Sequence, residues 1–405
     1  MRLLVRNRDF RILVLAHGFS ALGDYLALIA LTLRVHDLTA SGWAISALLL
    51  AGLVPLVVLA PLAGYIVDRF ETVRVLGLTA AAQTAVALGL AFAESVPAIV
   101  ALFFVLSAGF AITQPAVFAL TPTAAGPENT GDANAYLEIA RWSGATAGPF
   151  LAGALTAGLG FDAAVLANAC TFAIVAIATP FLRVRRPSDD EGSDPAAAGG
   201  RRGFTAIRRD RMLLLVVASV GVMVVFAAID NVAEVFFAKD TLGAGEVGYG
   251  ALVTAWTTGM VIGATLIARR IPLRSLPTGV VAAGVAGGAA LLVAVAWPTL
   301  PLALIAFVIG GTANGVELVA MRTLIHHRVP RAQHGRVFAA YYGIVNGAQI
   351  AAMTAGGALV AGVGARASLA IGGGGTLLVG IVGLVFVGRL RRRGAAEPGY
   401  SAAAS

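Results

Sequence analysis

The amino-acid sequence predicts an all-α membrane protein with about twelve transmembrane helices in two pseudo-symmetric six-helix bundles. Of its 405 residues, 58% are hydrophobic and only 12% are charged, about half of the charged share of a soluble domain. Apolar runs of about twenty residues recur along the chain, and each is long enough to cross about 30 Å of hydrocarbon. A polar, arginine-rich stretch divides these runs into two sets of six.

Clusters of Gly, Pro and charged residues separate the apolar runs, as expected for connections between helices. The expected spans are Ile12–Leu33, Trp43–Val67, Val75–Ala93, Ala98–Leu120, Ala133–Leu159, Ala163–Leu182, Met212–Phe237, Val247–Ala268, Leu276–Trp297, Leu300–Ala320, Val337–Val363 and Ala367–Val387. The stretch 183–211 carries eight arginines and is interpreted as a flexible cytoplasmic linker. The expected domains are therefore 1–182, the linker 183–211, and 212–405 with a basic tail.

The basic residues orient the spans. Of the 29 Lys and Arg residues, only Arg34, Lys239 and Arg366 fall in expected outer connections, and Arg141 lies within a span. The others lie at inner ends if both termini are cytoplasmic, which is a strong positive-inside asymmetry. We therefore expect a multi-pass protein of the cell (plasma or inner) membrane whose net charge of +8 reflects topology and not nucleic-acid binding. The first apolar run is too long for a signal-peptide core, so we expect it to be retained.

The two halves of the chain resemble each other. Arg8-Asp9-Phe10 precedes the first span as Arg209-Asp210-Arg211 precedes the seventh, 201 residues later, and Asp37 matches Asp240 at an offset of 203 residues. Two six-helix halves joined by a basic inner linker are typical of transporters built by internal duplication.

The connection after the second span carries the most specific motif, Gly64-Tyr65-Ile66-Val67-Asp68-Arg69, followed by Arg74. It resembles the loop signature of the major facilitator superfamily. The resemblance implies the major facilitator fold and a conformational latch made by Gly64, Asp68, Arg69 and Arg74. Gly64 would let the two helices turn closely, and ion pairs of Asp68 and Arg69 would exist only while the inner face is closed. The matching connection 268–274 lacks the Asp, so no symmetrical latch is expected.

The fifth span carries small residues at Gly144, Gly148 and Gly153, with Pro149 beside them. Gly144 and Gly148 allow close helix packing, and Pro149 softens the helix. The pattern loosely resembles the Gly-Pro motif of the family's exporters, although simple packing is an alternative because the spacing recurs on other spans. With Gly23-Asp24 in the first span, these motifs look most like the branch of proton antiporters that exports drugs, macrolides and siderophores. That resemblance implies efflux, drug resistance and a monomer.

Ionisable residues at membrane depth are candidate functional sites. Asp24 lies thirteen residues after Arg11, about 20 Å along a helix, and so near the midplane of the first span. A carboxylate there could carry a proton in one conformation and release it in the other, which makes Asp24 the first candidate for proton coupling or for contact with a cationic substrate. The alternative is a structural Asp that is hydrogen-bonded between helices.

Acidic residues in the fifth and seventh spans are further candidates. Glu138 and Arg141 share a helix face and can neutralise each other, which favours a structural or gating pair over direct contact with substrate. Asp230 and Glu234 lie four residues apart in the outer part of the seventh span. They could form an outer gate or cation entry point, or hydrate an outer vestibule.

The tenth span adds Asn314 and Glu317, which share a face near its inner end, where Arg322 could pair with Glu317. The histidines of the following inner loop lack further ligands, so we expect no metal site. The single cysteine, Cys170, excludes a disulfide framework.

The leading hypothesis is a proton-coupled secondary transporter that exports hydrophobic or cationic organic compounds by alternating access and needs no cofactor. No Gly-x-x-x-x-Gly-Lys-Ser/Thr motif occurs, so direct use of ATP is not expected. The rivals are proton-coupled uptake of a small metabolite and, from other classes, a non-transporting receptor or an intramembrane enzyme. Enzyme activity is not expected, because the chain lacks clustered Ser, His or carboxylate pairs at one depth. The expected partners are a small organic molecule, protons and membrane lipid.

Overall fold

The computed structural model describes residues 3–4, 7–184 and 199–396, and every regular element in this part is a helix. Among the described residues, nine helices are long and apolar enough to cross a membrane. The number becomes ten when α3 (Gly42–Val58) and α4 (Ala60–Arg69) are counted as one bent span. The prediction of a multi-pass α-helical protein is confirmed.

The chain forms two compact units. Unit 1 comprises Met1–Pro195 and Glu234–Thr254, and unit 2 comprises Ala196–Ala233 and Ala255–Ser405. Unit 1 therefore contains a segment from the second half of the sequence.

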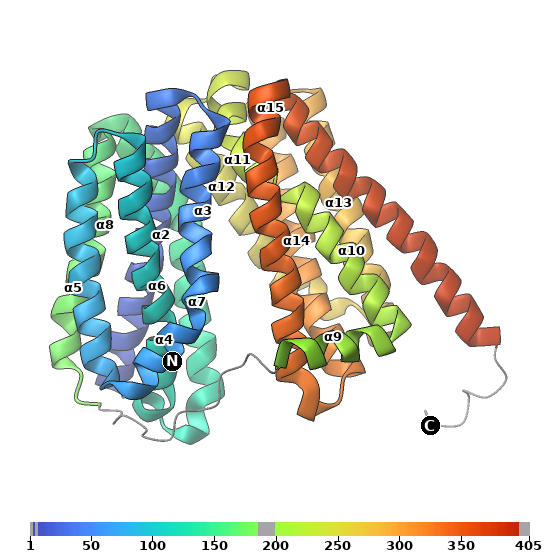
Figure 1. Cartoon of the computed structure of the whole chain (residues 1–405), viewed down its shortest axis with the longest axis horizontal. Coiled ribbons are helices and arrows are strands. Elements are labelled where there is room, and N and C mark those ends of the chain that lie inside the picture. Colours follow the sequence, from blue (N-terminus) through green and yellow to red (C-terminus); the bar gives the residue numbers. More distant parts are fainter. Residues whose placement is uncertain (1–2, 5–6, 185–198, 397–405) are drawn as a thin grey trace. The chain divides into compact units, whose positions relative to one another are not determined.

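Most of unit 1 comes from the first half of the chain. Its further helices are α2 (Arg8–Thr39), α5 (Thr72–Ala91), α6 (Val96–Ala125), α7 (Thr130–Leu159) and α8 (Phe161–Ala178), with the short turns η1 (Pro127–Asn129) and η2 (Thr179–Phe181). α5 lies alongside α6 and α8, and α2 packs against α7 and α8 (Figure 1). The Asp9 carboxylate joins the start of α2 to the residues that follow η2, because it accepts hydrogen bonds from the N–H groups of Arg183 and Val184 at 3.0 and 2.8 Å.

The second expected span is not one straight helix. α3 and α4 meet at Leu59 with a bend of 52°. Pro55 lies one turn before this break and has no N–H to donate, so the helix is weakened there.

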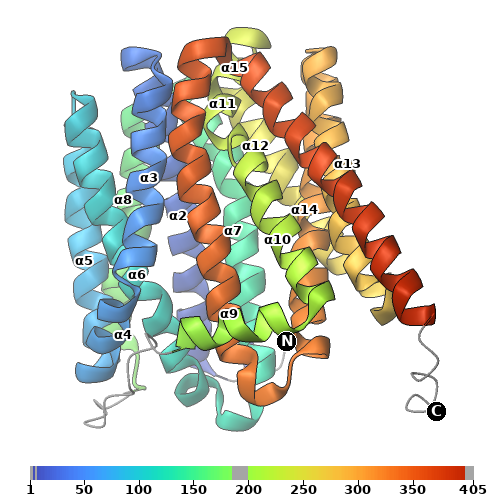
Figure 2. The same ribbon diagram turned by 45° about the vertical axis from the view of Figure 1, so that its right-hand side comes forward.

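Unit 2 comes from the second half of the chain. Its helices are α9 (Gly199–Arg209), α10 (Arg211–Ala227), α13 (Leu276–Ala296), α14 (Leu300–Arg328) and α15 (His334–Ala396), with the turns η5 (Gly263–Ile267), η6 (Ala268–Arg270), η7 (Leu273–Ser275) and η8 (Arg331–Gln333). Three elements, α11 (Asp230–Phe236), the π-helical η4 (Phe237–Thr241) and α12 (Gly245–Ile262), lie wholly or partly in the segment that belongs to unit 1. Figure 2 shows α10 beside α15, with α13 and α14 packed next to them.

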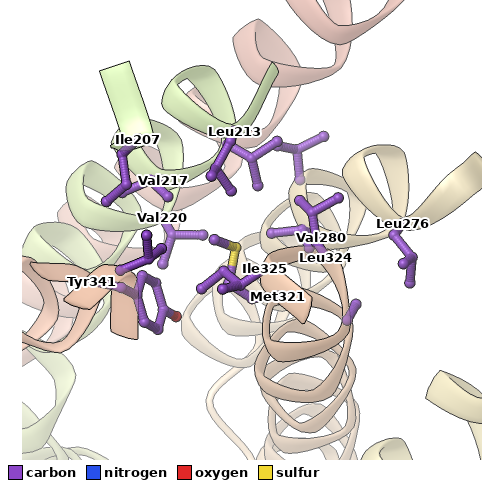
Figure 3. Packing of buried hydrophobic residues seen from close by; sticks show 14 of the residues in the cluster. Ile207, Leu213, Val217, Val220, Leu276, Val280, Met321, Leu324, Ile325 and Tyr341 are labelled. Atoms are coloured by element: carbon purple, nitrogen blue, oxygen red, sulfur yellow. The ribbon is translucent and has the colours of Figure 1, made fainter. Parts of the chain in front are cut away.

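Within 183–211, the expected linker, residues Gly199–Arg209 form the helix α9. Ile207 of α9 is buried with Val217 and Val220 of α10 and with Tyr341 of α15 (Figure 3). Gly203 lies so close to the backbone carbonyl of Arg336 that an added Cβ would overlap it. This packing holds α9 in place although its exposed face is basic. Residues 185–198 of the expected linker lie outside the described residues.

The last two expected spans form α15, which changes direction at Gly364. This residue has φ 81° and ψ 166°, a backbone conformation that favours glycine. The Arg366 side chain, two residues later, donates hydrogen bonds to the backbone carbonyls of Val295 (2.9 Å) and Ala296 (3.3 Å) at the end of α13.

Asp210 caps α10 and joins it to the end of α14. Its Oδ1 accepts hydrogen bonds from the N–H groups of Met212 and Leu213, and its Oδ2 lies 2.6 Å from Nε of Arg328. Partial burial raises the pKa of Asp210, but the bonds from Arg328 and the two N–H groups outweigh burial, so the pKa lies below its usual value. The charged form therefore stabilises the fold.

We predict that Asp210→Ala lowers the free energy of unfolding by about 1 kcal/mol through loss of the cap, and by more through loss of the Arg328 pair. Asp210→Asn keeps a capping oxygen and should fall between Ala and wild type. Because the folded pKa is lowered, the advantage of wild type over Asp210→Asn should be full above about pH 4 and vanish as the pH falls through the folded pKa. Thermal unfolding in detergent across this range tests both points. Equal melting temperatures for all three proteins would contradict the assignment.

Candidate coupling and substrate site

A polar cluster lies between α2 and α7 in unit 1. It comprises His17, Asp24 and Tyr25 of α2 and Glu138 and Arg141 of α7. Arg141 Nη2 donates to Glu138 Oε2 at 2.8 Å, so the ion pair suggested by their spacing forms. The two helices touch beside these residues, because an added Cβ at Gly18, next to His17, would lie 3.3 Å from Cβ of Ala140, next to Arg141.

The guanidinium of Arg141 is held from a second side. It lies over the ring of Trp142, 4.4 Å from the ring centroid, which is within the range of a cation–π contact. The His17 ring makes an edge contact with Phe118 of α6, with the ring centroids 6.3 Å apart. Aromatic side chains thus border the charged groups.

Unlike Glu138, Asp24 forms no ion pair or hydrogen bond through its carboxylate with the described residues. Its Oδ2 is buried and accepts no hydrogen bond from the described residues. The preceding residue, Gly23, packs against α8, where an added Cβ would overlap the Thr171 hydroxyl and lie 2.6 Å from the Asn168 amide oxygen. Neither side-chain polar atom of Asn168 has a hydrogen-bond partner in the described part of the chain. Buried polar groups left in this way favour binding of a proton, a water or a ligand.

The glycines of the fifth span bring α7 against α2. A Cβ at Gly144 would lie 2.7 Å from the carbonyl oxygen of Gly18 and from the amide nitrogen of Leu22. A Cβ at Gly148 would lie 2.7 Å from Cβ of Tyr25. Close packing through this small-xxx-small pair is therefore present, and it places the Glu138–Arg141 pair beside α2.

The same stretch of α7 also contacts the start of α12. Added Cβ atoms at Gly153 and Gly250 would overlap the backbone carbonyls of Glu246 and Pro149. In addition, Thr254 Oγ1 donates to the carbonyl of Thr146 at 3.1 Å. The Gly-Pro motif thus packs against two helices, one from each half of the sequence.

Four residues form a charge box at one end of unit 1. Lys239 Nζ lies 2.5 Å from Asp37 Oδ1, and His36 Nε2 lies 3.2 Å from Asp240 Oδ2. Each basic residue contacts the acid of the other pair, and the two pairs are separated by 203 residues in the sequence. Lys239 also bonds to Glu246 at 2.9 Å. The bases are buried (8% and 15% side-chain exposure) while the acids are half-exposed, so the box excludes water from the bases.

The acidic pair of the seventh span lies at a break in that span. α10 ends at Ala227, and Asp230 begins the short α11, which also carries Glu234. The boundary between units 1 and 2 falls between the two carboxylates.

Unit 2 has a polar cluster of its own between α14 and α15. Asn314 and Glu317 lie one turn apart on α14. The pairing of Glu317 with Arg322 that the sequence suggested is absent between these described residues. Arg322 Nε instead donates to the Tyr342 hydroxyl at 3.0 Å. Five residues of helix separate the two side chains by roughly 140°, so they lie on different faces of α14.

The expected latch lies at the end of α4 and the start of α5. Gly64 is inside α4, and a Cβ there would meet no atom within 4 Å, so the close turn expected at Gly64 is not present in this structure. Asp68 and Arg69 form the last turn of α4. Glu71 caps α5 by accepting from the N–H of Arg74 at 3.0 Å.

Sequence reasoning missed the charge box and the Asn168 side chain. The box could have been found, because the offset of 203 residues that relates Asp37 to Asp240 also relates His36 to Lys239. Residues at equivalent positions of two repeats can meet across a pseudo-twofold axis, where each contacts its counterpart's neighbour. Nothing in the sequence marks Asn168 as lacking hydrogen bonds.

Comparison with known proteins adds a family and a fold. The family model of the Major Facilitator Superfamily matches residues 13–316 and 237–403. An uncharacterized MFS-type transporter of Bacillus subtilis (strain 168), YfiS, is 25% identical over 392 residues, which cover 94% of both chains.

Solved structures are similar in fold at lower sequence identity. The crystal structure of the nucleoside transporter NupG matches with a TM-score of 0.72 at 13% identity, over 95% of this chain and 99% of that one. A bacterial homologue of the iron transporter ferroportin, in an inward-facing state, matches with a TM-score of 0.72 at 16% identity, over 94% and 98%. At these identities the likeness shows the fold alone.

We predict that Gly144→Ala destabilises unit 1 by about 1–3 kcal/mol, because the new methyl group meets backbone atoms of α2 that cannot move aside. Gly158→Ala on the same helix is the matched control, since a Cβ there meets nothing within 4 Å. It should be neutral or slightly stabilising. Thermal unfolding of the purified variants decides the matter. If Gly144→Ala melts at or above the temperature of Gly158→Ala, the close approach of α2 and α7 is not a constraint.

Proposed function

The chain belongs to the Major Facilitator Superfamily, and on this premise we propose that it is a secondary transporter that exports hydrophobic or cationic organic compounds in exchange for protons. The observation that carries this proposal is Asp24, a carboxylate with a buried oxygen that accepts no hydrogen bond from the described residues. In the exchange of an organic cation for a proton, one acidic group can bind the cation or the proton, but not both at once. Asp24 meets this description better than Glu138, which is already paired with Arg141.

The proposed topology has twelve spans with both termini cytoplasmic. Nine helices in the described part of the chain, together with the bent α3–α4 pair, provide ten. Two more arise if the arms of α15 on either side of Gly364 each cross the membrane and if α7 is also a span. α7 is 30 residues long, but it carries Asp132, Glu138 and Arg141 besides many small residues, which lowers its hydropathy. Two six-helix bundles, 1–182 and 212–405, then flank the segment 183–211.

In this proposal Asp24 alternates between a proton and the substrate. The charge of Arg141, shared with Glu138, sets how strongly a cation is repelled from the cluster. The Trp142 and Phe118 rings supply apolar surface to an organic substrate. Asp230, Glu234, Asn314 and Glu317 are the secondary candidates for proton or substrate contact.

Alternating access requires contacts that exist in only one conformation. We assign this role at the outer end to the charge box of His36, Asp37, Lys239 and Asp240, since it joins residues from the two halves of the chain. At the inner end the role falls to Gly64, Asp68, Arg69 and Arg74. In this proposal the charge box forms while the outer face is closed and breaks when that face opens.

Proton-coupled uptake of a small metabolite is the second candidate function. The similarity in fold to a nucleoside transporter is compatible with it, although fold does not determine the direction of transport. Transport assays in right-side-out and inverted vesicles under the same proton gradient separate export from uptake.

We predict that cells producing the wild-type protein expel fluorescent cationic compounds, and that a protonophore stops this efflux. Asp24→Asn should reduce proton-driven efflux at least about tenfold, because the amide cannot take up a proton, while exchange of substrate down its own gradient persists. Asp162→Asn is the matched control, since Asp162 is an exposed carboxylate at the start of α8. Normal efflux by Asp24→Asn would remove Asp24 from the coupling role. Efflux by no tested compound under any gradient would favour uptake instead.

We also predict that Lys239→Gln opens the proposed outer face. The reporter is a cysteine introduced by Tyr25→Cys in a Cys170→Ser background, labelled from outside by a membrane-impermeant maleimide. Lys239→Gln should make this labelling several-fold faster, because Asp37 and Glu246 lose their shared positive partner and repel each other. Glu94→Gln is the control, as Glu94 is an exposed residue in the connection between α5 and α6. Unchanged labelling in Lys239→Gln would show that the charge box does not hold this face closed.

A further inference from the structure

We propose that unit 2 binds the phosphate-bearing headgroup of an anionic phospholipid in a cavity at the ends of its helices. The cavity has a volume of about 460 Å³. It lies where the start of α10, the turn η7, the start of α13 and the ends of α14 and α15 meet. This inference does not depend on the proposed direction of transport or on Asp24.

The walls of the cavity carry an excess of positive charge. Arg274 of η7, His327 and Arg328 of α14 and Arg391 of α15 all line it. Arg328 is already paired with Asp210, at 2.6 Å between Nε and Oδ2. Within the described chain Arg274 and Arg391 have no ion pair, so two guanidinium groups remain uncompensated.

The backbone helps to position these two groups. The Arg391 side chain donates a hydrogen bond to the carbonyl of Arg274, which holds the end of α15 against η7. The remaining guanidinium N–H groups can reach a phosphate, for which arginine has a matching planar geometry. The positive end of the α13 dipole adds to the potential, because Ser275 lines the cavity and its side chain makes no capping bond.

The rest of the lining favours a lipid over a free anion. Met212, Leu273, Pro277 and Leu324 give the cavity an apolar wall, which a small hydrated anion would not use. The cavity also lies at the ends of the candidate spans Arg211–Thr241, Leu273–Ala296, Leu300–Arg328 and Arg331–Arg393, where a bilayer changes from hydrocarbon to headgroups. Basic pockets between transmembrane helices at this depth suit anionic headgroups.

The test uses the full-length protein in nonionic detergent, with lipid adducts counted by native mass spectrometry. Phosphatidylglycerol is the probe and phosphatidylcholine the neutral comparison. The variant Arg274→Gln/Arg391→Gln is matched with Arg270→Gln/Arg392→Gln, which removes the same charge from exposed neighbours outside the cavity lining. We expect wild type and the control to prefer phosphatidylglycerol, and the cavity variant to bind it about tenfold more weakly or worse.

Three outcomes would overturn the proposal. Equal loss in both double variants would mean that diffuse surface charge attracts the lipid. Equal binding of phosphatidylglycerol and phosphatidylcholine would mean that the headgroup charge is not recognised. Inorganic phosphate could also displace phosphatidylglycerol and raise the melting temperature of the protein as much as the lipid does. That result would assign the cavity to a free anion. Arg274→Lys/Arg391→Lys keeps the charges, and recovery of binding in that variant would support the site and show that binding does not depend on guanidinium geometry.

Discussion

The close approach of α2 and α7 is the constraint on which the candidate site depends. Without side chains at Gly144 and Gly148, the backbone of α7 comes close to the turns of α2 that carry His17 and Tyr25. In hydrocarbon there is no hydrophobic force to draw helices together, so such contact rests on shape and on polar pairs. The same stretch of α7 also packs against the start of α12, so one glycine-rich segment contacts two helices of unit 1.

Much of the fold could be predicted because the bilayer permits few structures. A chain that must satisfy every backbone N–H and C=O in lipid forms helices, and hydropathy shows where they lie. Local deviations were harder to predict. Pro55 was visible in the sequence, but whether it kinks a span or ends it depends on neighbouring helices. α9 was missed because its polar composition hides Ile207, which anchors it to the core of unit 2.

The candidate site was predictable in its members but not in their pairing. Glu138 with Arg141 followed from helical spacing, since both partners lie on one helix. Pairs between helices require the packing itself, and for that reason Arg322 was assigned to Glu317 when it contacts Tyr342. Residues at matching positions of the two halves also make different contacts. Asp210 caps a helix, whereas Asp9 accepts hydrogen bonds from the backbone N–H groups of Arg183 and Val184, which follow η2. Duplication therefore conserves positions more faithfully than contacts.

The junction at Gly364 has a mechanical consequence. The two arms of α15 are joined through a single residue of positive φ, with no loop between them. A connection without slack cannot absorb a rotation of one arm, so tilting either arm must carry the other with it. The Arg366 bonds to the end of α13 extend this coupling to a third helix. The two arms of α15 and the end of α13 would then move as one rigid body. A flexible segment inserted at Gly364 would uncouple the two arms.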